Sequence, residues 1–143
     1  MTTLVLDASV AVKWFLPAKS EPLAAEALAL YQNYQRQNIG FIVPDIFWAE
    51  IGSAFWKAIR AGRVQKISAH AAITELLQCE FPTVAIATLL ENAFLIATTF
   101  ERSIYDSLYV ALASQSGAEL VTADEKLANA LASRFPVKWL GAI

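Results

Sequence analysis

The amino-acid sequence predicts a three-layer α/β/α fold, in which helices cover both faces of a central, mostly parallel sheet. Short apolar segments alternate along the chain with longer segments of helical periodicity, and this order is typical of parallel sheets. The apolar segments are continuous rather than alternating, as expected of strands buried on both faces. With 143 residues, no repeat and no linker, the chain fits one domain covering residues 1–143.

The first predicted strand runs from Thr2 to Leu6 and is followed by an acidic residue, Asp7. Ligands of open α/β sheets bind beyond the carboxyl ends of the strands, so a carboxylate here faces the usual location of a site. Asp is also a favoured N-cap residue, and Asp7 taken alone is explained more simply as the cap of a helix that begins near Ala8. The other acidic residues must decide between these interpretations.

The next segments alternate between helices and a second strand. Pro17 ends the first helix, and Ser20 is expected to cap the second. Pro44 breaks the second strand, Asp45 caps the third helix and Gly62 closes it. The expected elements are helices over residues 8–16, 20–37 and 46–61, and a strand over residues 41–43.

The second half of the chain continues the alternation. Ser68 is expected to cap a helix that runs to Cys79, and Ser103 opens a later helix with a capping-box sequence and an end at Gly117. The other expected elements are strands over residues 84–87, 119–122 and 137–140, a helix over residues 89–100 and a helix opened by residues 123–126.

The composition of the chain limits where in the cell the protein is expected and which kinds of partner it is expected to bind. The longest run without a charged residue or histidine has 12 residues, from Ser107 to Ala118, which is too short to span a bilayer. No secretory signal is visible, and a single cysteine cannot form an internal disulfide, so we expect a cytoplasmic protein. The net charge of -2 lacks the basic footprint of proteins that bind nucleic acid by charge alone, and 57% hydrophobic residues favour a partner or a second copy.

Four acidic residues from distant parts of the chain meet at one edge of the predicted sheet. Asp7 and Asp124 follow the carboxyl ends of two strands, and Glu50 lies early in the helix after another strand. Asp106 lies in the first turn of a helix that runs antiparallel to the following strand, which places it at the same edge. A cap or a solvated helix face explains each acid separately, but the arrival of all four at one edge favours a shared site.

Four neighbouring carboxylates need a counter-charge, because their mutual repulsion raises their pKa values sharply. Oxygen ligands without a cluster of His or Cys suit a hard cation such as Mg²⁺ or Mn²⁺. Such an ion lowers the pKa of a bound water and stabilises an oxygen leaving phosphorus. The sequence therefore predicts hydrolysis of phosphodiester bonds.

The segments around these acids resemble the PIN-domain ribonucleases, and closely the VapC-type toxins of type II toxin–antitoxin pairs. The matching segments occur in the right order over nearly the whole chain, although residues 64–100 match only in pattern. They are residues 5–15, Pro44-Asp45 leading to Glu50, residues 105–113 and residues 120–127.

The resemblance implies a PIN-like fold and a Mg²⁺-dependent endoribonuclease. It also implies a homodimer and a cognate antitoxin that occupies an apolar groove and blocks the site. The hydroxyl groups of Ser9 and Thr122 are implied to position the acidic cluster or its waters. The implied catalytic residues and metal ligands are Asp7, Glu50, Asp106 and Asp124.

The sequence also offers candidates for the RNA and antitoxin surfaces. Lys57, Arg60 and Arg63 share the end of the helix that carries Glu50, and we expect them to hold RNA phosphates. Several aromatic residues near the early helices exceed the needs of a small core, so some are candidates for the antitoxin groove, although core packing explains any one of them. These residues are Trp14, Phe15, Trp48 and Trp56.

Two other functions remain open at this point. A phosphatase with Asp7 as its nucleophile also uses Mg²⁺, but its usual form needs a second acid two residues later, where this chain has Ser9. In a non-catalytic interaction module the acids are only caps and surface charge. A melting temperature that rises with Mg²⁺ distinguishes a metal enzyme from such a module.

Overall fold

The computed structural model describes residues 1–143 and contains a five-stranded parallel sheet with the strand order β3-β2-β1-β4-β5. The strands are β1 (Thr2–Leu6), β2 (Ile39–Pro44), β3 (Thr83–Val84), β4 (Glu119–Thr122) and β5 (Val137–Trp139). The helices are α1 (Ala8–Ala11), α2 (Ala24–Gln35), α3 (Ile46–Arg60), α4 (Lys66–Gln78), α5 (Ile86–Phe100), α6 (Ile104–Ser116) and α7 (Glu125–Leu131). The predicted parallel α/β architecture is confirmed.

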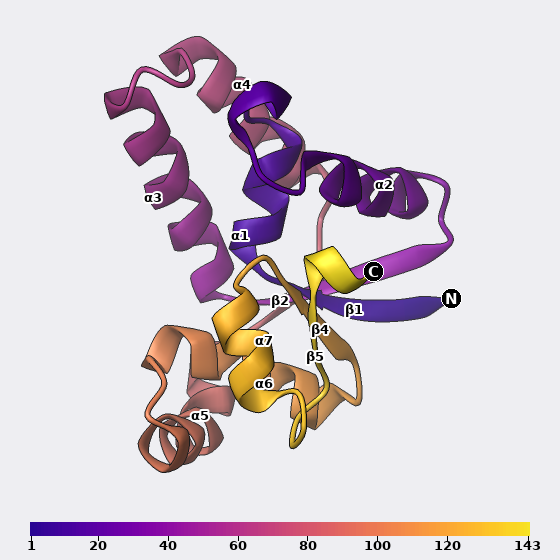
Figure 1. The fold of residues 1–143 in the computed structure, drawn as a ribbon, viewed down its shortest axis with the longest axis vertical. Helices are drawn as coiled ribbons and strands as arrows, with labels where there is room; N and C mark the ends of the chain where they lie inside the picture. Colours follow the sequence, from indigo (N-terminus) through magenta and orange to yellow (C-terminus); the bar gives the residue numbers. More distant parts are fainter.

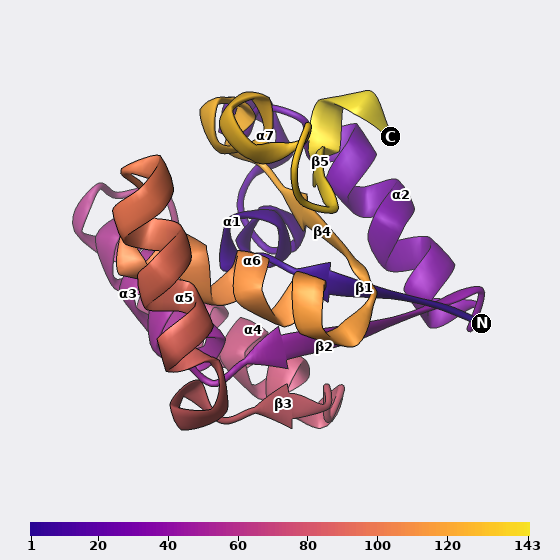
Figure 2. The same cartoon turned by 90° about the horizontal axis from the view of Figure 1, so that it is seen from below.

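The helices form layers on both faces of the sheet (Figure 1). Helices α1 and α2 lie on one face with α3 and α4 beyond them, whereas α6 lies across the other face and α5 packs outside it (Figure 2). Helix α7 packs beside β4 and β5. None of the helices combines the length and the apolar composition that a membrane crossing requires.

Strand β1 is the centre of the sheet and of the hydrophobic core. It pairs in parallel with β2 through Leu4 and Phe41, and with β4 through Leu6 and Val121. The side chains of Val5 and Leu6 are fully buried, which explains the continuous apolar run in the sequence. The two neighbouring strands therefore fix where β1 ends, and with it the position of Asp7.

Several helix ends form as predicted. After α3, Gly62 adopts a positive φ of 72°, and the Arg63 N–H donates to the Ala58 carbonyl oxygen at 2.9 Å, which satisfies a carbonyl at the end of the helix. The Ser103 hydroxyl accepts a hydrogen bond from the Asp106 N–H at 3.0 Å and caps α6. Asp45 precedes α3 as expected, but its side chain makes no capping hydrogen bond.

Other boundaries differ from the prediction. Ser20 ends a 3-10 turn, and α2 starts later, at Ala24, after Leu23 turns through a left-handed conformation. Ser68 does not cap α4, because the helix already begins at Lys66. A cap contributes only about 1 kcal/mol, so packing and the preceding turn decide where these helices begin.

Several other elements are shorter or longer than predicted. The first helix changes at Val12 into a 3-10 turn. The strand expected over residues 84–87 is limited to β3, because Ile86 already belongs to α5. The last strand ends at Trp139, and Leu140 begins a short 3-10 turn.

Candidate active site

A pocket of about 240 Å³ lies at the carboxyl edge of the sheet, and all four predicted acids line it. The end of β1, the second turn of α3, the first turn of α6 and the turn after β4 each supply one carboxylate. Its lining consists of Asp7, Ala8, Ser9, Val12, Glu50, Ala54, Asp106 and Asp124. The structure therefore brings together acids that are separated by up to 117 positions in the sequence, from residue 7 to residue 124.

Asp7 is the most buried of the four acids, with only 9% of its surface exposed. The Thr122 hydroxyl donates to its Oδ2 at 2.7 Å, and the Ser9 N–H donates to its Oδ1 at 3.2 Å. Burial raises the pKa of Asp7 to about 6, against the lowering effect of these hydrogen bonds and with a further rise from the charges of Glu50 and Asp106. Asp7 is thus both the cap of α1 and a wall of the pocket.

The two predicted supporting hydroxyls tie β1 to the turn after β4. Thr122 donates to Asp7 and accepts the Asp124 N–H at 3.1 Å. The Ser9 hydroxyl accepts the Ala123 N–H at 3.2 Å. These contacts hold the segment with Asp7 against the segment with Asp124, which is the geometry that a positioning role needs.

Glu50 and Asp106 both line the pocket and are both half-buried. Burial raises the pKa of Glu50 despite a hydrogen bond from Tyr109, and the Asp106 charge raises it further. Burial also raises the pKa of Asp106; the Asp124 charge adds to this rise, while Ser103 and Arg102 oppose it. Three neighbouring carboxyl groups with raised pKa values mark a pocket that resists holding its full negative charge without a cation.

Asp124 is the most exposed of the four acids. Its Oδ1 accepts the Leu127 N–H at 3.2 Å and caps α7, as the sequence predicts for the start of this helix. Asp124 therefore lies on the solvent-exposed side of the pocket, whereas Asp7 is buried.

The donor set of the pocket fits a hard divalent cation, since its charged groups are all carboxylates and it contains no His or Cys. No group of three or more such side chains is gathered closely enough to form a complete ligand set by itself. Mg²⁺ keeps several waters and is often held by only one or two carboxylates, so carboxylates at this spacing suit a largely hydrated ion.

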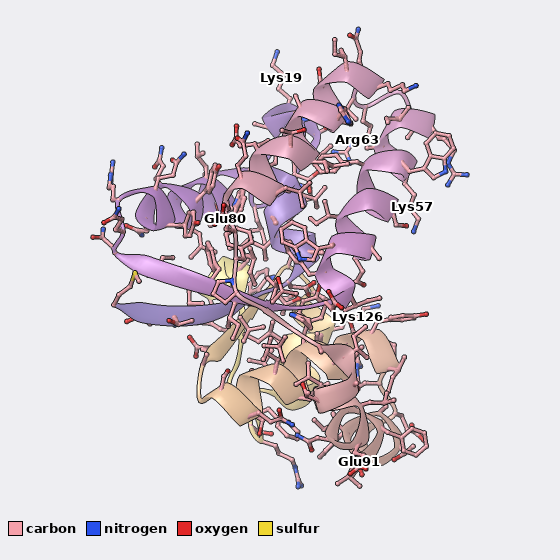
Figure 3. The ribbon with its side chains drawn as sticks, turned by 180° about the vertical axis from the view of Figure 1, so that it is seen from behind. Lys19, Lys57, Arg63, Glu80, Glu91 and Lys126 are labelled. Atoms are coloured by element: carbon pink, nitrogen blue, oxygen red, sulfur yellow. The ribbon has the colours of Figure 1, made fainter.

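The structure separates the three cations predicted to bind RNA. Lys57 extends outward from α3 (Figure 3), two turns after Glu50 on the same side of the helix. Arg60 is exposed and stacks over Trp56, with its guanidinium carbon 5.2 Å from the ring centroid. Arg63 lies beyond α3 and pairs with Glu21 at 2.6 Å, so a carboxylate of the same chain already balances its positive charge.

The four aromatic residues proposed for one groove do not share a location. Trp14 and Phe15 line a separate pocket of about 580 Å³ that also includes Arg63, Val64 and Ser68. The Trp48 ring packs against Phe47 and Phe81 near β3, and Trp56 is 57% exposed on the outside of α3. Only Trp14 and Phe15 therefore remain candidates for the same groove.

Arg63, which lines this aromatic pocket, belongs to a network of ion pairs between side chains. Glu21 accepts a hydrogen bond from Lys13 at 2.8 Å as well as from Arg63, and the side chains of Lys13 and Glu21 are both less than a tenth exposed. Burial opposes the ionisation of Glu21, but the two cations outweigh it and lower the pKa of this carboxyl group. The network ties the segment before α2 to the turn between α3 and α4.

The sequence interpretation missed two residues at the acidic pocket. Tyr109 is on the buried part of α6, with its side chain only 1% exposed, and its hydroxyl donates to Glu50 Oε1 at 2.7 Å. Burial raises the pKa of Tyr109, so the phenol stays protonated. Arg102 lies one turn before Asp106, with 4.0 Å between its guanidinium and the carboxylate. Residues three or four positions apart on a helix are neighbours, so the positions of Tyr109, three residues after Asp106, and Arg102, four residues before it, could have pointed to them.

The fold and the pocket define an α/β protein with four carboxylates at the carboxyl edge of a parallel sheet. The chain belongs to the PIN domain family, because the sequence model of that family matches residues 4–131. The predicted resemblance is therefore confirmed at the level of the family.

Individual relatives agree with this assignment. The chain is 30% identical over 136 residues to Ribonuclease VapC3 of Pyrobaculum aerophilum, covering 93% of this chain and 95% of that protein. Its fold is similar to the crystal structure of PAE2754 from the same organism, with a TM-score of 0.70, 22% identity and coverage of 99% and 85%. It is also similar to VapBC2 from Rickettsia felis, solved with a DNA fragment from their promoter, with a TM-score of 0.64, 15% identity and coverage of 96% and 98%.

Proposed function

We propose that this protein is a Mg²⁺- or Mn²⁺-dependent endoribonuclease that hydrolyses RNA phosphodiester bonds and acts as the toxin of a toxin–antitoxin pair. The observation that carries the proposal is the pocket lined by four carboxylates from four separate segments. Membership of the PIN domain family and a relative named as a ribonuclease support it.

The residues of the pocket have different parts in the proposed reaction. A bound divalent ion supplies a water of lowered pKa and stabilises charge on the phosphate. Asp7 presents a fixed carboxylate, because Thr122 and the Ser9 N–H hold both of its oxygens. Asp106 and Asp124 lie on the more exposed side, where they would hold waters of the hydrated ion and where an RNA phosphate would enter.

Basic residues near this open side are proposed to hold the RNA backbone. Arg102 is the cation nearest to the acids, since only its guanidinium lies within 4.0 Å of one of them. Lys57 carries a free, exposed ammonium group on the Glu50 side of α3. Arg60 lies further around that helix, and Arg63 is engaged by Glu21, so both are weaker candidates.

We predict that the purified protein cuts RNA only when a divalent ion is present. An end-labelled RNA is incubated with Mg²⁺, with Mn²⁺, or with excess chelator, and the fragments are separated on a gel. A generic phosphate monoester in parallel assays tests the phosphatase alternative. Full RNA cleavage in excess chelator, or hydrolysis of the ester alone, contradicts the proposal.

A cognate antitoxin is proposed to bind the pocket lined by Trp14 and Phe15. This pocket is larger than the acidic one, and four of its nine lining residues are hydrophobic. The apolar face of an amphipathic helix matches such a surface. The solved relatives include a toxin–antitoxin complex from Klebsiella pneumoniae, which supports an antitoxin partner for this chain.

A homodimer is proposed to form through the outer face of α5. Phe94 and Leu95 are each 62% exposed on this helix, and Leu90 lies one turn earlier on the same side as Phe94. An exposed apolar cluster of this kind favours association with a second copy.

Size-exclusion chromatography with light scattering tests both the proposed dimer face and the proposed antitoxin pocket. For the chain alone we expect a molar mass of twice 15.6 kDa, the mass of a dimer. For Phe94→Glu we expect the mass of the monomer. With its cognate antitoxin, the wild type is expected to form a larger complex, whereas Ser68→Arg, whose long side chain fills the aromatic pocket, is expected not to. A monomeric wild type refutes the dimer, and normal complex formation by Ser68→Arg refutes the antitoxin site.

A further inference from the structure

The hydroxyl of Tyr109 lies under the acidic pocket, although the side chain is only 1% exposed. It donates a hydrogen bond to Glu50 Oε1 at 2.7 Å. It also accepts the N–H of Ala8, directly after Asp7, at 3.4 Å. One phenol on α6 thus joins α3 to the start of α1, so it links the segments that carry two of the four acids.

We infer that Tyr109 is a positioning residue that sets the orientation of the Glu50 carboxylate toward a divalent cation in the pocket. The inference rests on the proposed function, because it needs a cation between these acids. Tyr109 is not among the residues that line the pocket, so it acts through Glu50 rather than on the cation or the RNA directly.

The geometry explains why a hydroxyl is needed at this position. The bond from Tyr109 is the only hydrogen bond that Glu50 receives from the protein, so it alone restrains the rotation of this carboxylate. A hydrogen bond from a hydroxyl to a carboxylate is charge-assisted and therefore stronger than a neutral one. The phenol holds Oε1 and so fixes the plane of the carboxylate, Oε2 makes no hydrogen bond within the protein, and the Ala8 N–H keeps the phenol in place.

The contact is not explained by core packing alone. A phenylalanine at position 109 has nearly the same volume and apolar surface, so packing does not require the hydroxyl. Elsewhere in the molecule, the Tyr31 hydroxyl donates to Glu75 Oε2 at 2.6 Å, and neither residue lines the acidic pocket. Tyr31 therefore provides a matched control with the same chemistry at a carboxylate outside the site.

The experiment measures Mn²⁺ binding without RNA, from the paramagnetic resonance signal of free Mn²⁺ during a titration. Outer-shell partners of metal ligands typically change metal affinity 10- to 100-fold, so we expect Tyr109→Phe to bind Mn²⁺ about tenfold more weakly than the wild type. Tyr31→Phe is expected to bind like the wild type. Equal Mn²⁺ affinity of Tyr109→Phe and the wild type overturns the inference.

A second measurement uses the wild type and does not depend on folding of the variant. The chain contains four tyrosines, and ¹³C labelling of the ring carbon bonded to the hydroxyl group gives four resonances. Tyr→Phe variants at the other three positions assign these resonances. We expect Mg²⁺ to shift the Tyr109 resonance and to leave that of Tyr31 unchanged. An unshifted Tyr109 resonance at saturating Mg²⁺ overturns the inference.

The outcomes separate this inference from the proposed function. If the wild type cuts RNA and binds Mn²⁺ while Tyr109→Phe binds equally well, only the role of Tyr109 is wrong. If the wild type neither binds Mn²⁺ nor cuts RNA, the proposed function fails and the role of Tyr109 fails with it.

Discussion

Asp7→Asn and Asp106→Asn are each expected to lower the rate of RNA cleavage by about 10³-fold. Both substitutions keep the size of the side chain and remove one negative charge from the pocket that is proposed to hold the cation. Loss of a metal ligand removes several kcal/mol of transition-state stabilisation, and about 4 kcal/mol corresponds to a factor of about 10³. Single-turnover cleavage of a labelled RNA at saturating Mg²⁺ measures the effect.

The matched control is Glu80→Gln, which removes an exposed carboxylate just after α4, away from the pocket (Figure 3). It should cut RNA at the wild-type rate. In a host whose growth the wild type arrests, the two Asp variants should be tolerated and Glu80→Gln should remain toxic. Equal toxicity of the wild type and Asp7→Asn would contradict the assignment of the site.

The second large effect is on the stability of the metal-free protein. The pKa of Asp7 rises from 3.8 to about 6 on folding, so the folded state holds this proton more tightly than the unfolded state. The free energy of unfolding therefore falls as the pH rises from below about 4 to above about 6, and the loss from Asp7 alone is about 3 kcal/mol. Glu50 and Asp106, whose pKa values are also raised, act in the same direction.

A comparison with Asp7→Asn isolates this effect. The amide does not titrate, so the stability of the variant relative to the wild type should increase by about 3 kcal/mol between about pH 4 and about pH 7.5. Urea unfolding at several pH values in the presence of chelator measures the difference. If the difference in the free energy of unfolding between the two proteins does not depend on pH, burial does not disfavour the ionised form of Asp7.

Added Mg²⁺ should offset most of this loss of stability in the wild type at neutral pH. Binding to the folded state alone stabilises the wild type by about 2.7 kcal/mol at an ion concentration of about 100 times Kd. The variant with both Asp7→Asn and Asp106→Asn should gain nothing. Equal stabilisation of both proteins by Mg²⁺ would favour a non-catalytic module with nonspecific ion binding.

The alternation of strands and helices along the chain and the location of Asp7 and Asp124 were predictable because both depend on local sequence. Buried parallel strands are continuous apolar runs, and an acid directly after such a run, as in Asp7 and Asp124, lies at the carboxyl edge whatever the rest of the chain does. The two interpretations of Asp7 also proved compatible, since one carboxylate caps α1 and lines the pocket.

The contacts that the sequence did not predict depend on which faces of distant helices meet. Tyr109 has the spacing of a core residue, and only the packing of α6 against the sheet brings its hydroxyl to Glu50, 59 positions away. Trp48 and Trp56 lie on the same helix but at different ends and sides, so a count of aromatic residues does not predict a shared groove. Arg63 was expected to be free because its partner, Glu21, lies 42 positions earlier.

The hydrogen bond from Thr122 to Asp7 joins two residues that are 115 positions apart. A chain that is still being synthesised, and has been completed only as far as Ala118, contains neither β4 nor Asp124. Its β1 lacks one neighbouring strand, and its Asp7 lacks the donor that fixes it. A growing chain therefore cannot assemble the acidic pocket until most of its length has left the ribosome.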